Sequence, residues 1–487
     1  MINRNRDGSR RGVDLQNDGI GGLMLKLALP AIAAQVINAL YNIVDRIYIG
    51  NLPGAEGTNS IAALGVCFPL VIVISAFGTL VGVGGSSLAA IRMGEGRRET
   101  AERILSNCLP LLAAFTAVIM PVCLLFGREL LLLVGATENT VDYAVPYFHI
   151  YVLGTLPVLI ALGLNSFINT QGFAAVSMLT VLIGAVSNIV LDPILIYGFH
   201  LGVQGAAIAT VTSQLISAVW VLCFLCGKKT RLRLRVSFMR PRWSLIGPVL
   251  ALGLSPFIMN STESLVGIVI NTTLASVSPD GATADLYIGA YAIIGSVMQL
   301  VMMPLTGLSQ GAQPIISYNY GAARFDRVKK AYRYFLGSAV TFTAVVWAAV
   351  MLFPGLFIRL FSSDAALSAA AVRFIRVYLL MIVLMAVQIA CQQTFVATGH
   401  AKVSLFLALL RKVILLIPLI LLFSRFWAEM GVFIAEPVAD TLAVTVTALL
   451  FIANRKSVFG NPRLAAEERE ETKAGDTKSR PSDEKKG

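Results

Sequence analysis

Asp192 stands in an apolar run and has neighbours that suit cation chemistry. The stretch SNIVLDPILIYG runs from Ser187 to Gly198, and the residues around its acid are mostly Ile, Val and Leu. Asn188 lies four residues before Asp192, on the same face of a helix. Pro193 has no amide hydrogen, which frees the carbonyl of Ile189 and predicts a helix kink. A carboxylate, an amide oxygen and a freed carbonyl together could hold a proton or a hard cation such as Na⁺.

Residues in the neighbouring apolar runs could add oxygen atoms to this site. Asn165 lies in the run before Asp192, and Thr210 lies in the run after it. Either residue alone is a weak indication, because Asn and Thr also serve as polar contacts between membrane helices. Together with Asn188 and Asp192 they form a set of oxygen-bearing side chains confined to the first half of the chain.

Four other acids also stand within apolar runs: Asp45, Glu263, Glu436 and Asp440. A charge at bilayer depth costs roughly 2.5 kcal/mol or more, so such an acid either has a function or is neutralised by a buried partner. Arg411 and Lys412 lie near enough to one membrane face that we expect them to extend toward the headgroups. Arg46 follows Asp45 directly, but adjacent helical residues point about 100° apart, so their adjacency in sequence does not assure a tight pair.

The composition is that of a membrane protein. Of 487 residues, 56% are hydrophobic and 14% are charged, with a mean hydropathy of +0.76. A soluble domain carries roughly a quarter of charged residues. Apolar runs of about 20 residues, enough to cross a hydrocarbon core about 30 Å thick, recur along the chain. The six cysteines lie in or beside these runs without disulfide-like spacing, so we interpret them as small apolar residues.

The apolar runs predict an all-α polytopic membrane protein with twelve transmembrane helices. The predicted spans are 23–50, 60–91, 101–127, 143–170, 173–197, 205–227, 244–275, 284–318, 329–353, 367–397, 402–426 and 431–454. Residues 1–22 form a polar arm before the first span. Residues 455–487 are dense in both charge signs and poor in apolar residues, which predicts a disordered tail.

Loop charges predict the orientation of the chain. The stretch from Lys228 to Arg242 carries seven basic residues and no acid. By the positive-inside rule, this linker (228–243) and both termini face the cytoplasm, with the protein in the plasma (bacterial inner) membrane. The net charge of +12 then reflects topology and attraction to anionic lipids. A nucleic-acid partner explains this charge less well, because no folded soluble module is available to hold the contacts.

The second half of the sequence echoes the first at a nearly constant offset. GGSSLAAIRMGEGRRETAERILSN from Gly84 aligns with GAQPIISYNYGAARFDRVKKAYRY from Gly311. Shorter matches follow in the same order, and ordered matches at one offset indicate an internal repeat. The chain therefore divides into two pseudo-symmetric six-helix bundles, 23–227 and 244–454. Two such bundles facing each other can enclose a cavity and rock between inward and outward openings, which favours a transporter.

The second half does not repeat the polar set of the first. At the offset of the repeat, Asn188 and Asp192 correspond to Leu415 and Leu419. The second half offers a weakly polar, methionine-containing set instead: Glu263, Gln299, Met302, Met303 and Gln388. Methionine adapts its shape to varied apolar ligands, so this set is a candidate substrate cavity, with ordinary helix packing as the alternative.

Three stretches resemble the bacterial type of the multidrug and toxic compound extrusion (MATE) family. They are LALPAIAAQVINALYNIVDRIYIG, SNIVLDPILIYGFHLGVQGAAIAT and GLSQGAQPIISYNYGAARFDRVKKA, and the resemblance covers residues 20–455. It implies a secondary antiporter that exports organic, often cationic, compounds in exchange for protons or sodium. It also implies a cation site in the first lobe at Asp45, Asn188, Asp192 and Thr210, with Asn165 beside it. In one branch of the family a glutamate matching Glu263 works with an aspartate of the tenth helix, but 367–397 has no acid, so we expect coupling in the first lobe.

Other functional classes are less well supported. A related flippase for a lipid-linked saccharide is the main alternative, but it would need buried Arg or Lys residues for a pyrophosphate. An enzyme would need a nucleophile–base or metal constellation, and the three histidines are scattered without such spacing. A channel would leave the duplication unexplained. We therefore expect a multidrug efflux antiporter that acts as a monomer, without a cofactor beyond H⁺ or Na⁺, on organic cations in the lipid bilayer.

Overall fold

The computed structural model describes residues 13–52, 55–361 and 364–460, and within these ranges all regular structure is helical. In the first half, the helices are α1 (Ile20–Gly50), α2 (Ala55–Gly94), α3 (Arg98–Leu125), α4 (Gly127–Leu133), α5 (Glu138–Leu153), α6 (Thr155–Thr170), α7 (Ala174–Pro193), η1 (Ile194–Gly198) and α8 (Gly202–Cys226). A short turn, η2 (Val236–Phe238), interrupts the loop between the halves. In the second half, they are α9 (Trp243–Val277), α10 (Gly281–Gly321), α11 (Phe325–Leu352), α12 (Pro354–Arg359), α13 (Ala365–Tyr378), α14 (Ile382–Ala397), α15 (Ala401–Leu409), η3 (Leu410–Leu416), α16 (Ile417–Ala453) and α17 (Arg455–Phe459).

The described helices account for the twelve predicted spans. Nine helical segments are long and apolar enough to cross a membrane, and two bent pairs, α5–α6 and α13–α14, bring the number to eleven. One of the nine, Ala401–Ala453, has 53 residues and would be about 80 Å long if straight, far more than a bilayer core. Its backbone leaves helical geometry at Trp427 and Ala428, between the predicted spans 402–426 and 431–454. This segment therefore supplies two spans.

Two local expectations need correction or fall outside the described residues. The tail is not disordered from its start, because Arg455–Phe459 forms α17 and Val458 is fully buried. Residues 1–12 of the predicted arm and 461–487 of the tail lie outside the described residues. Pro193 ends the α-helical pattern of α7, as its missing amide requires, and the chain continues as the π-helix η1.

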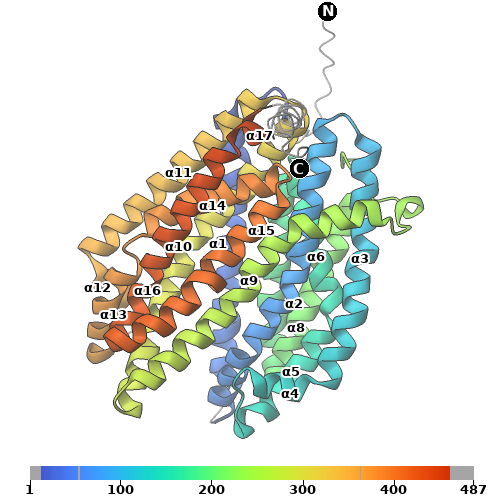
Figure 1. The fold of residues 1–487 in the computed structure, drawn as a ribbon. Helices are drawn as coiled ribbons and strands as arrows, with labels where there is room; N and C mark the ends of the chain where they lie inside the picture. Colours follow the sequence, from blue (N-terminus) through green and yellow to red (C-terminus); the bar gives the residue numbers. More distant parts are fainter. Residues whose placement is uncertain (1–12, 53–54, 362–363, 461–487) are drawn as a thin grey trace, which may run out of the picture.

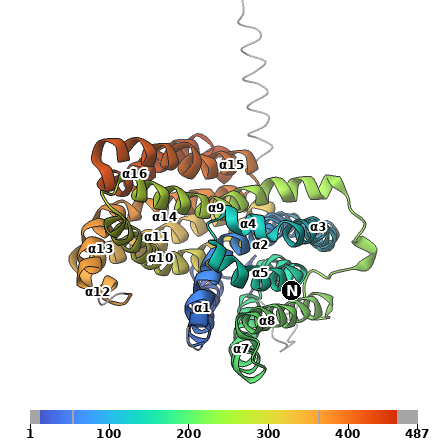
Figure 2. The same cartoon turned by 90° about the horizontal axis from the view of Figure 1, so that it is seen from below.

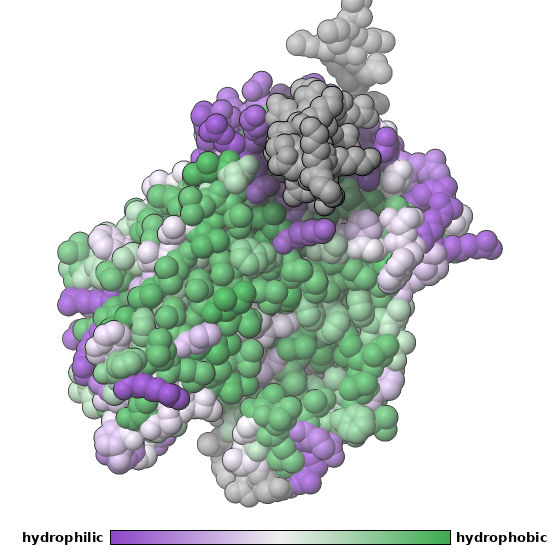
Figure 3. Space-filling model, viewed as in Figure 1, coloured by the Kyte–Doolittle hydropathy of each residue, from purple (hydrophilic) through white to green (hydrophobic). Residues whose placement is uncertain are grey.

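The helices form two bundles that lie side by side and splay apart at one end (Figure 1). Seen from below, α2, α3, α5, α7 and α8 gather on one side and α10, α11, α13, α14 and α16 on the other (Figure 2). Hydrophobic residues cover most of the face seen in Figure 3, and the lower edge of this face is hollowed between the two bundles. This arrangement confirms the expected two-lobe membrane fold.

Close contacts between the lobes follow the internal repeat. Gly94 of α2 lies against the backbone of Tyr318 in α10, and Gly321 of α10 lies against the backbone of Ile91 in α2. At the offset of the repeat, Ile91 corresponds to Tyr318, and Gly94 corresponds to Gly321. The two contacts are thus equivalent under the repeat. At both positions a Cβ atom would collide with a carbonyl oxygen of the other lobe, so only glycine permits this approach.

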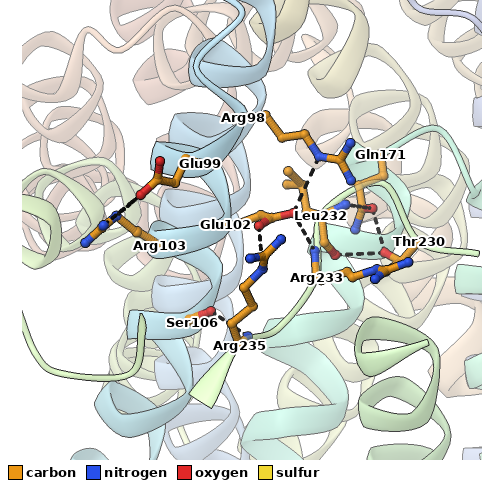
Figure 4. Close-up of polar contacts among 10 residues, drawn as sticks. All are labelled: Arg98, Glu99, Glu102, Arg103, Ser106, Gln171, Thr230, Leu232, Arg233 and Arg235. Atoms are coloured by element: carbon orange, nitrogen blue, oxygen red, sulfur yellow. Dashed lines mark hydrogen bonds and ion pairs between the residues drawn. The ribbon is translucent and has the colours of Figure 1, made fainter. Parts of the chain in front are cut away.

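We call the end of the molecule where these contacts lie the basic end, defined by residues 13–19, 95–98, 227–242 and 322–327. The loop 227–242 is packed against the first lobe rather than extended between the lobes. Glu102 of α3, 3% exposed, pairs with Arg98 and Arg235, whereas the side-chain oxygen of Gln171 accepts from the backbone amides of Arg231 and Leu232 (Figure 4). A buried carboxylate and amide thus hold the basic loop on the bundle.

The N-terminal arm contacts both lobes at the basic end. Arg231 of the loop donates a hydrogen bond to the carbonyl of Val13 at 3.0 Å. In the second lobe, Arg327 donates to the carbonyl of Asp18 at 2.7 Å, and Asn319 donates to the carbonyl of Leu15 at 3.2 Å. Leu15 itself is fully buried. The arm therefore connects the lobes at the end where their helices converge.

Candidate functional site

A cavity of about 360 Å³ lies between the lobes, in the half of the molecule away from the basic end. The first lobe contributes α1, α2, α5, α6 and α8 to its wall, and the second lobe contributes Asn260 of α9 and Gln299 of α10. The volume lies within the range of small-molecule sites, roughly 300–1,000 Å³. Carboxylate, amide and tyrosine side chains line it beside Phe68 and several aliphatic residues. This lining suits an amphipathic ligand.

Asp45 is the carboxylate of this cavity. It lies near the end of α1 and is 8% exposed. Its Oδ1 atom receives no hydrogen bond from the described residues. The neighbouring Arg46 also lines this cavity, with its guanidinium 5.6 Å from the ring centre of Phe68, and it interacts electrostatically with Asp45. No described hydrogen bond or ion pair joins Arg46 to the Asp45 carboxylate, because successive helical residues point about 100° apart. Asp45 therefore presents an oxygen that a proton or cation could engage.

Asn188 and Asp192 form a buried pair on α7. Asn188 donates a hydrogen bond from Nδ2 to Oδ1 of Asp192 at 3.0 Å, and both residues are buried. The other side-chain oxygens of the pair, Oδ1 of Asn188 and Oδ2 of Asp192, receive no donor from the described residues. Asp192 is near enough to Asp45 for their carboxylates to interact electrostatically. Two neighbouring carboxylates repel each other when both are ionised, so a proton or cation between them relieves a real cost.

Thr210 and Asn165 line two adjoining cavities of the first lobe. Thr210 of α8 lines the cavity that contains Asp45. Asn165 of α6 lines an adjoining cavity of about 180 Å³, donates to the carbonyl of Ser177 at 3.2 Å, and keeps an unpartnered Oδ1. Asn38, Tyr41 and Gln214 line both cavities. The five residues predicted for cation coupling thus come from four helices of the first lobe. Asp45 and Thr210 line the larger cavity and Asn165 lines the smaller one, whereas Asn188 and Asp192 are not among the described lining residues of either.

The chemistry of this region suits a proton or a monovalent cation. Its donors are carboxylate, amide and hydroxyl oxygens, which are ligands for hard cations. Within the described ranges, no group of three or more His, Cys, Asp or Glu residues could hold a metal ion. A transition-metal centre of the usual His and Cys type therefore has no counterpart in the described part of the chain.

The five candidate substrate residues of the second half do not form one site. Gln299 lines the cavity, but Glu263, Met302, Met303 and Gln388 are not among its described lining residues. Met302 packs against the hydrophobic cluster that joins α1 and α10, and Met303 is half-buried. Gln388 is buried in α14 with an unpartnered Oε1, and Glu263 pairs with Lys412.

Several residues that line the two cavities were not predicted from the sequence, although their spacing indicates them. Gln35, Asn38, Asn42 and Asp45 follow one another at spacings of three, four and three residues, which places them on one face of α1. Gln35 and Asn38 line the smaller cavity, and Asn38, Asn42 and Asp45 line the larger one. A polar stripe along an apolar helix was the available signal.

The deep basic residues of the second lobe do not extend to the headgroups, contrary to expectation. Arg411 is buried and donates from Nη2 to Glu436 at 2.8 Å and from Nε to Asp440 at 2.6 Å. Lys412, also buried, contacts the carboxylate of Glu263. Glu263 lies on α9, whereas Glu436 and Asp440 lie on the part of α16 that follows the break at Trp427 and Ala428, which we call its second leg. The three carboxylates therefore reach the basic residues of η3 from other helical segments of the bundle. Pairing across helices outweighs extension toward the membrane surface here.

Comparisons with known proteins agree with this architecture. The sequence model of the MatE family matches residues 30–194 and again 257–422, one stretch in each half of the chain. The multidrug export protein MepA of Staphylococcus haemolyticus (strain JCSC1435) is 25% identical over 419 residues, covering 86% of this chain and 90% of that protein. MepA of Staphylococcus aureus (strain NCTC 8325) is 24% identical and covers 88% and 92%.

Solved structures give the same result for the fold. The MATE multidrug transporter DinF-BH, solved in complex with R6G, is 31% identical with a TM-score of 0.84, covering 93% of this chain and 99% of that one. A MATE family transporter of the MOP superfamily in an outward-facing conformation has the same TM-score and coverage at 23% identity.

Proposed function

Because the chain belongs to the MatE family, whose model matches both of its halves, we propose that it is an antiporter that exchanges organic cations for H⁺ or Na⁺. The chain is a multi-pass membrane transporter of the multidrug efflux type, as its family and the named relatives indicate.

One observation carries the coupling proposal. Asp45, Asn188, Asp192 and Asn165 each keep a buried side-chain oxygen without a donor from the described residues. Unpartnered buried oxygens are costly, and here Asp45 and Asn165 line adjoining cavities while Asp192 interacts electrostatically with Asp45. A proton or Na⁺ that binds there satisfies these oxygens and relieves the repulsion between Asp45 and Asp192.

The lining supports a cationic cargo. Asp45 supplies a negative charge, and Tyr41, Tyr147 and Tyr151 supply aromatic rings that attract cations, whereas the one basic residue of the described lining, Arg46, lies over the ring of Phe68. The flippase alternative is weaker, because Arg411 and Lys412 are engaged by carboxylates and are not available for a pyrophosphate.

We further propose that the basic end faces the cytoplasm of a bacterial cell, as the positive-inside rule favours. The described conformation is then outward-facing, with the lobes in contact on the cytoplasmic side. An ion can drive export only through different affinities for the two conformations. The ion binds from outside and favours reorientation without cargo, and its release inside lets the cargo bind.

Dye efflux from cells with equal amounts of protein tests the coupling residues. Asp192→Asn removes the charge with little change of shape, and we expect it to abolish active efflux. Asp280→Asn is the matched control, because Asp280 is an exposed helix cap and Asn caps equally well. Undiminished efflux by Asp192→Asn would remove Asp192 from the coupling role.

A further inference from the structure

The second lobe contains a cluster of charged side chains apart from the cavity described above. Arg411 and Lys412 come from the π-helix η3, Glu436 and Asp440 from the second leg of α16, and Glu263 from α9. Short π-helical segments occur often at functional sites. The cluster has three carboxylates and two basic groups, so its charges do not balance when all five are ionised.

The excess negative charge lies in the buried part of the cluster. One guanidinium, that of Arg411, faces the carboxylates of both Glu436 and Asp440, and these side chains are 7%, 7% and 5% exposed. Lys412 contacts Glu263, whose side chain is 67% exposed. The lysine charge is thus compensated at the exposed side of the cluster. Because the Lys412 ammonium contacts Glu263, one guanidinium is bonded to two buried carboxylates, and one further positive charge such as a proton would balance them.

Glu436 has the atom at which that charge is missing. Its Oε1 accepts from Arg411, but its Oε2 is buried and receives no hydrogen bond from any described residue. An ionised carboxylate can only accept hydrogen bonds, whereas a protonated one loses its charge and gains a donor. The groups that interact electrostatically with Glu436 are Arg411, Lys412 and Asp440, and it acts in turn on Tyr291 of α10 and Tyr378 of α13.

A metal cation fits this position less well than a proton does. A hard cation needs several oxygen ligands at once. Asp440 and Glu436 each already use an oxygen for Arg411, and the guanidinium repels a second cation. On the α14 side, Arg411 faces the sulfur of Met385 at 3.9 Å rather than a carboxylate.

We propose that Glu436 holds a proton in this conformation and that the Arg411–Glu436–Asp440 group is a second proton-binding site, in the C-terminal lobe. Lys412 connects this site with the exposed carboxylate of Glu263. An organic cation that binds Glu263 displaces the Lys412 ammonium toward Glu436 and Asp440. Lys412 then supplies the missing charge, and the proton passes from Glu436 to water. This last step alone rests on the proposed function, since it requires a cationic cargo.

Infrared difference spectroscopy of the full chain in lipid nanodiscs, without cargo, tests the proton site directly. Glu436→Gln should remove the absorption of one protonated carboxyl group and leave the fold intact, because glutamine resembles the protonated side chain. Asp440→Asn is the contrasting variant, because it leaves Arg411 without an ionised partner. We expect it to lower the midpoint of thermal unfolding far more than Glu436→Gln does. An unchanged carboxyl absorption in Glu436→Gln, or the reverse order of thermal stability, would overturn the proposal.

Labelling of the unmodified protein gives a second measurement that needs no variant. Dicyclohexylcarbodiimide reacts with protonated carboxyl groups in apolar surroundings, and peptide mass spectrometry locates the adduct. We expect an adduct on Glu436 that Na⁺ does not prevent and that a hydrophobic organic cation diminishes. Absence of the adduct, or protection by Na⁺, contradicts a proton at Glu436. An adduct that persists in the presence of the cation contradicts only the link through Lys412 and leaves the proton site intact.

Discussion

The intramembrane carboxylates of this protein have two kinds of surroundings. Asp45 and Asp192 have amide, hydroxyl and tyrosine neighbours and no described ion pair, with Arg46 near Asp45 but not bonded to it, whereas Glu436 and Asp440 share the guanidinium of Arg411. A charge without a partner is available for a mobile ion, and a paired charge contributes to the fold. The first-lobe carboxylates are therefore open to a mobile ion, whereas those of the second lobe are held by a fixed cation that also stabilises the fold.

Replacing Arg411 tests the structural role of its pairs. Arg411→Met keeps the length of the side chain but leaves two buried carboxylates without their partner. Because breaking a buried ion pair costs about 3–5 kcal/mol, we expect a large drop in thermal stability. Arg373→Met is the control, since Arg373 is 58% exposed and pairs with Glu429 at 3.6 Å. Such surface pairs contribute about 0–1 kcal/mol. Equal midpoints for the two variants, measured by size-exclusion chromatography after heating, would contradict a stabilising role for Arg411.

At the scale of elements, the spans could be predicted well because bilayer thickness fixes their length. The twelve predicted helices correspond to described helical segments, and the offset of the internal repeat recurs in the contacts of Gly94 and Gly321. The pairing of Arg411 with Glu436 and Asp440 could not be predicted. It depends on a turn at Trp427 and Ala428 that brings two legs together, and hydropathy gives no distance between helices.

The candidate site could be predicted only in part, because the sequence shows which residues share a helix but not which helices pack together. Asn188 and Asp192 are four residues apart, so helix geometry alone places them together. Asp45 and Thr210 meet through the packing of different helices, and only the resemblance to a family connected them. The polar stripe on α1, with Asn38 and Asn42, was visible in the sequence but lies outside the set that the resemblance implied.

The N-terminal arm contains a turn whose stability depends on the protonation of Asp14. Burial raises the pKa of Asp14, but hydrogen bonds from the side chain of Asn17 and from the amides of Gln16 and Asn17 outweigh it and hold this pKa below its usual value. The stabilisation from Asp14 is therefore present above the unfolded pKa of about 3.9 and is lost only in acid, as the pH falls through the folded pKa. The turn that presents the arm is intact at neutral pH.

Arg327→Ala should loosen the arm from the second lobe, because it removes the donor to the carbonyls of Leu15 and Asp18. We expect longer distances between spin labels on the two lobes at the basic end, measured by double electron–electron resonance in a cysteine-free background. Lys330→Ala removes the same charge from an exposed position of the same helix and should leave the distances unchanged. If both variants behave alike, net charge rather than the arm holds this end.

At the scale of the whole molecule, export requires that the lobes close at one end and open at the other. The closed end depends on glycines whose missing Cβ atoms let the lobes touch. Gly321→Ala introduces a Cβ that collides with the carbonyl of Ile91, and no side-chain rotation can relieve it. We expect this variant to favour opening at the basic end and to transport slowly.

Access of a thiol reagent to a cysteine placed in the cavity measures this shift. In a cysteine-free background, Gly321→Ala should increase labelling from the side of the basic end. Gly337→Ala is the control, because no atom lies within 4 Å of its added Cβ. Equal labelling in the two variants would show that the close approach at Gly321 does not limit the opening.

Transport by purified protein in liposomes tests the central claim, exchange of an organic cation for H⁺ or Na⁺ through Asp192. Separate outward-directed gradients of protons and of sodium are imposed, and uptake of a fluorescent organic cation is followed. We predict accumulation driven by one of the two gradients, its loss in Asp192→Asn and its retention in Asp280→Asn. Accumulation that ignores both gradients, or a driven accumulation that survives in Asp192→Asn, would contradict the account.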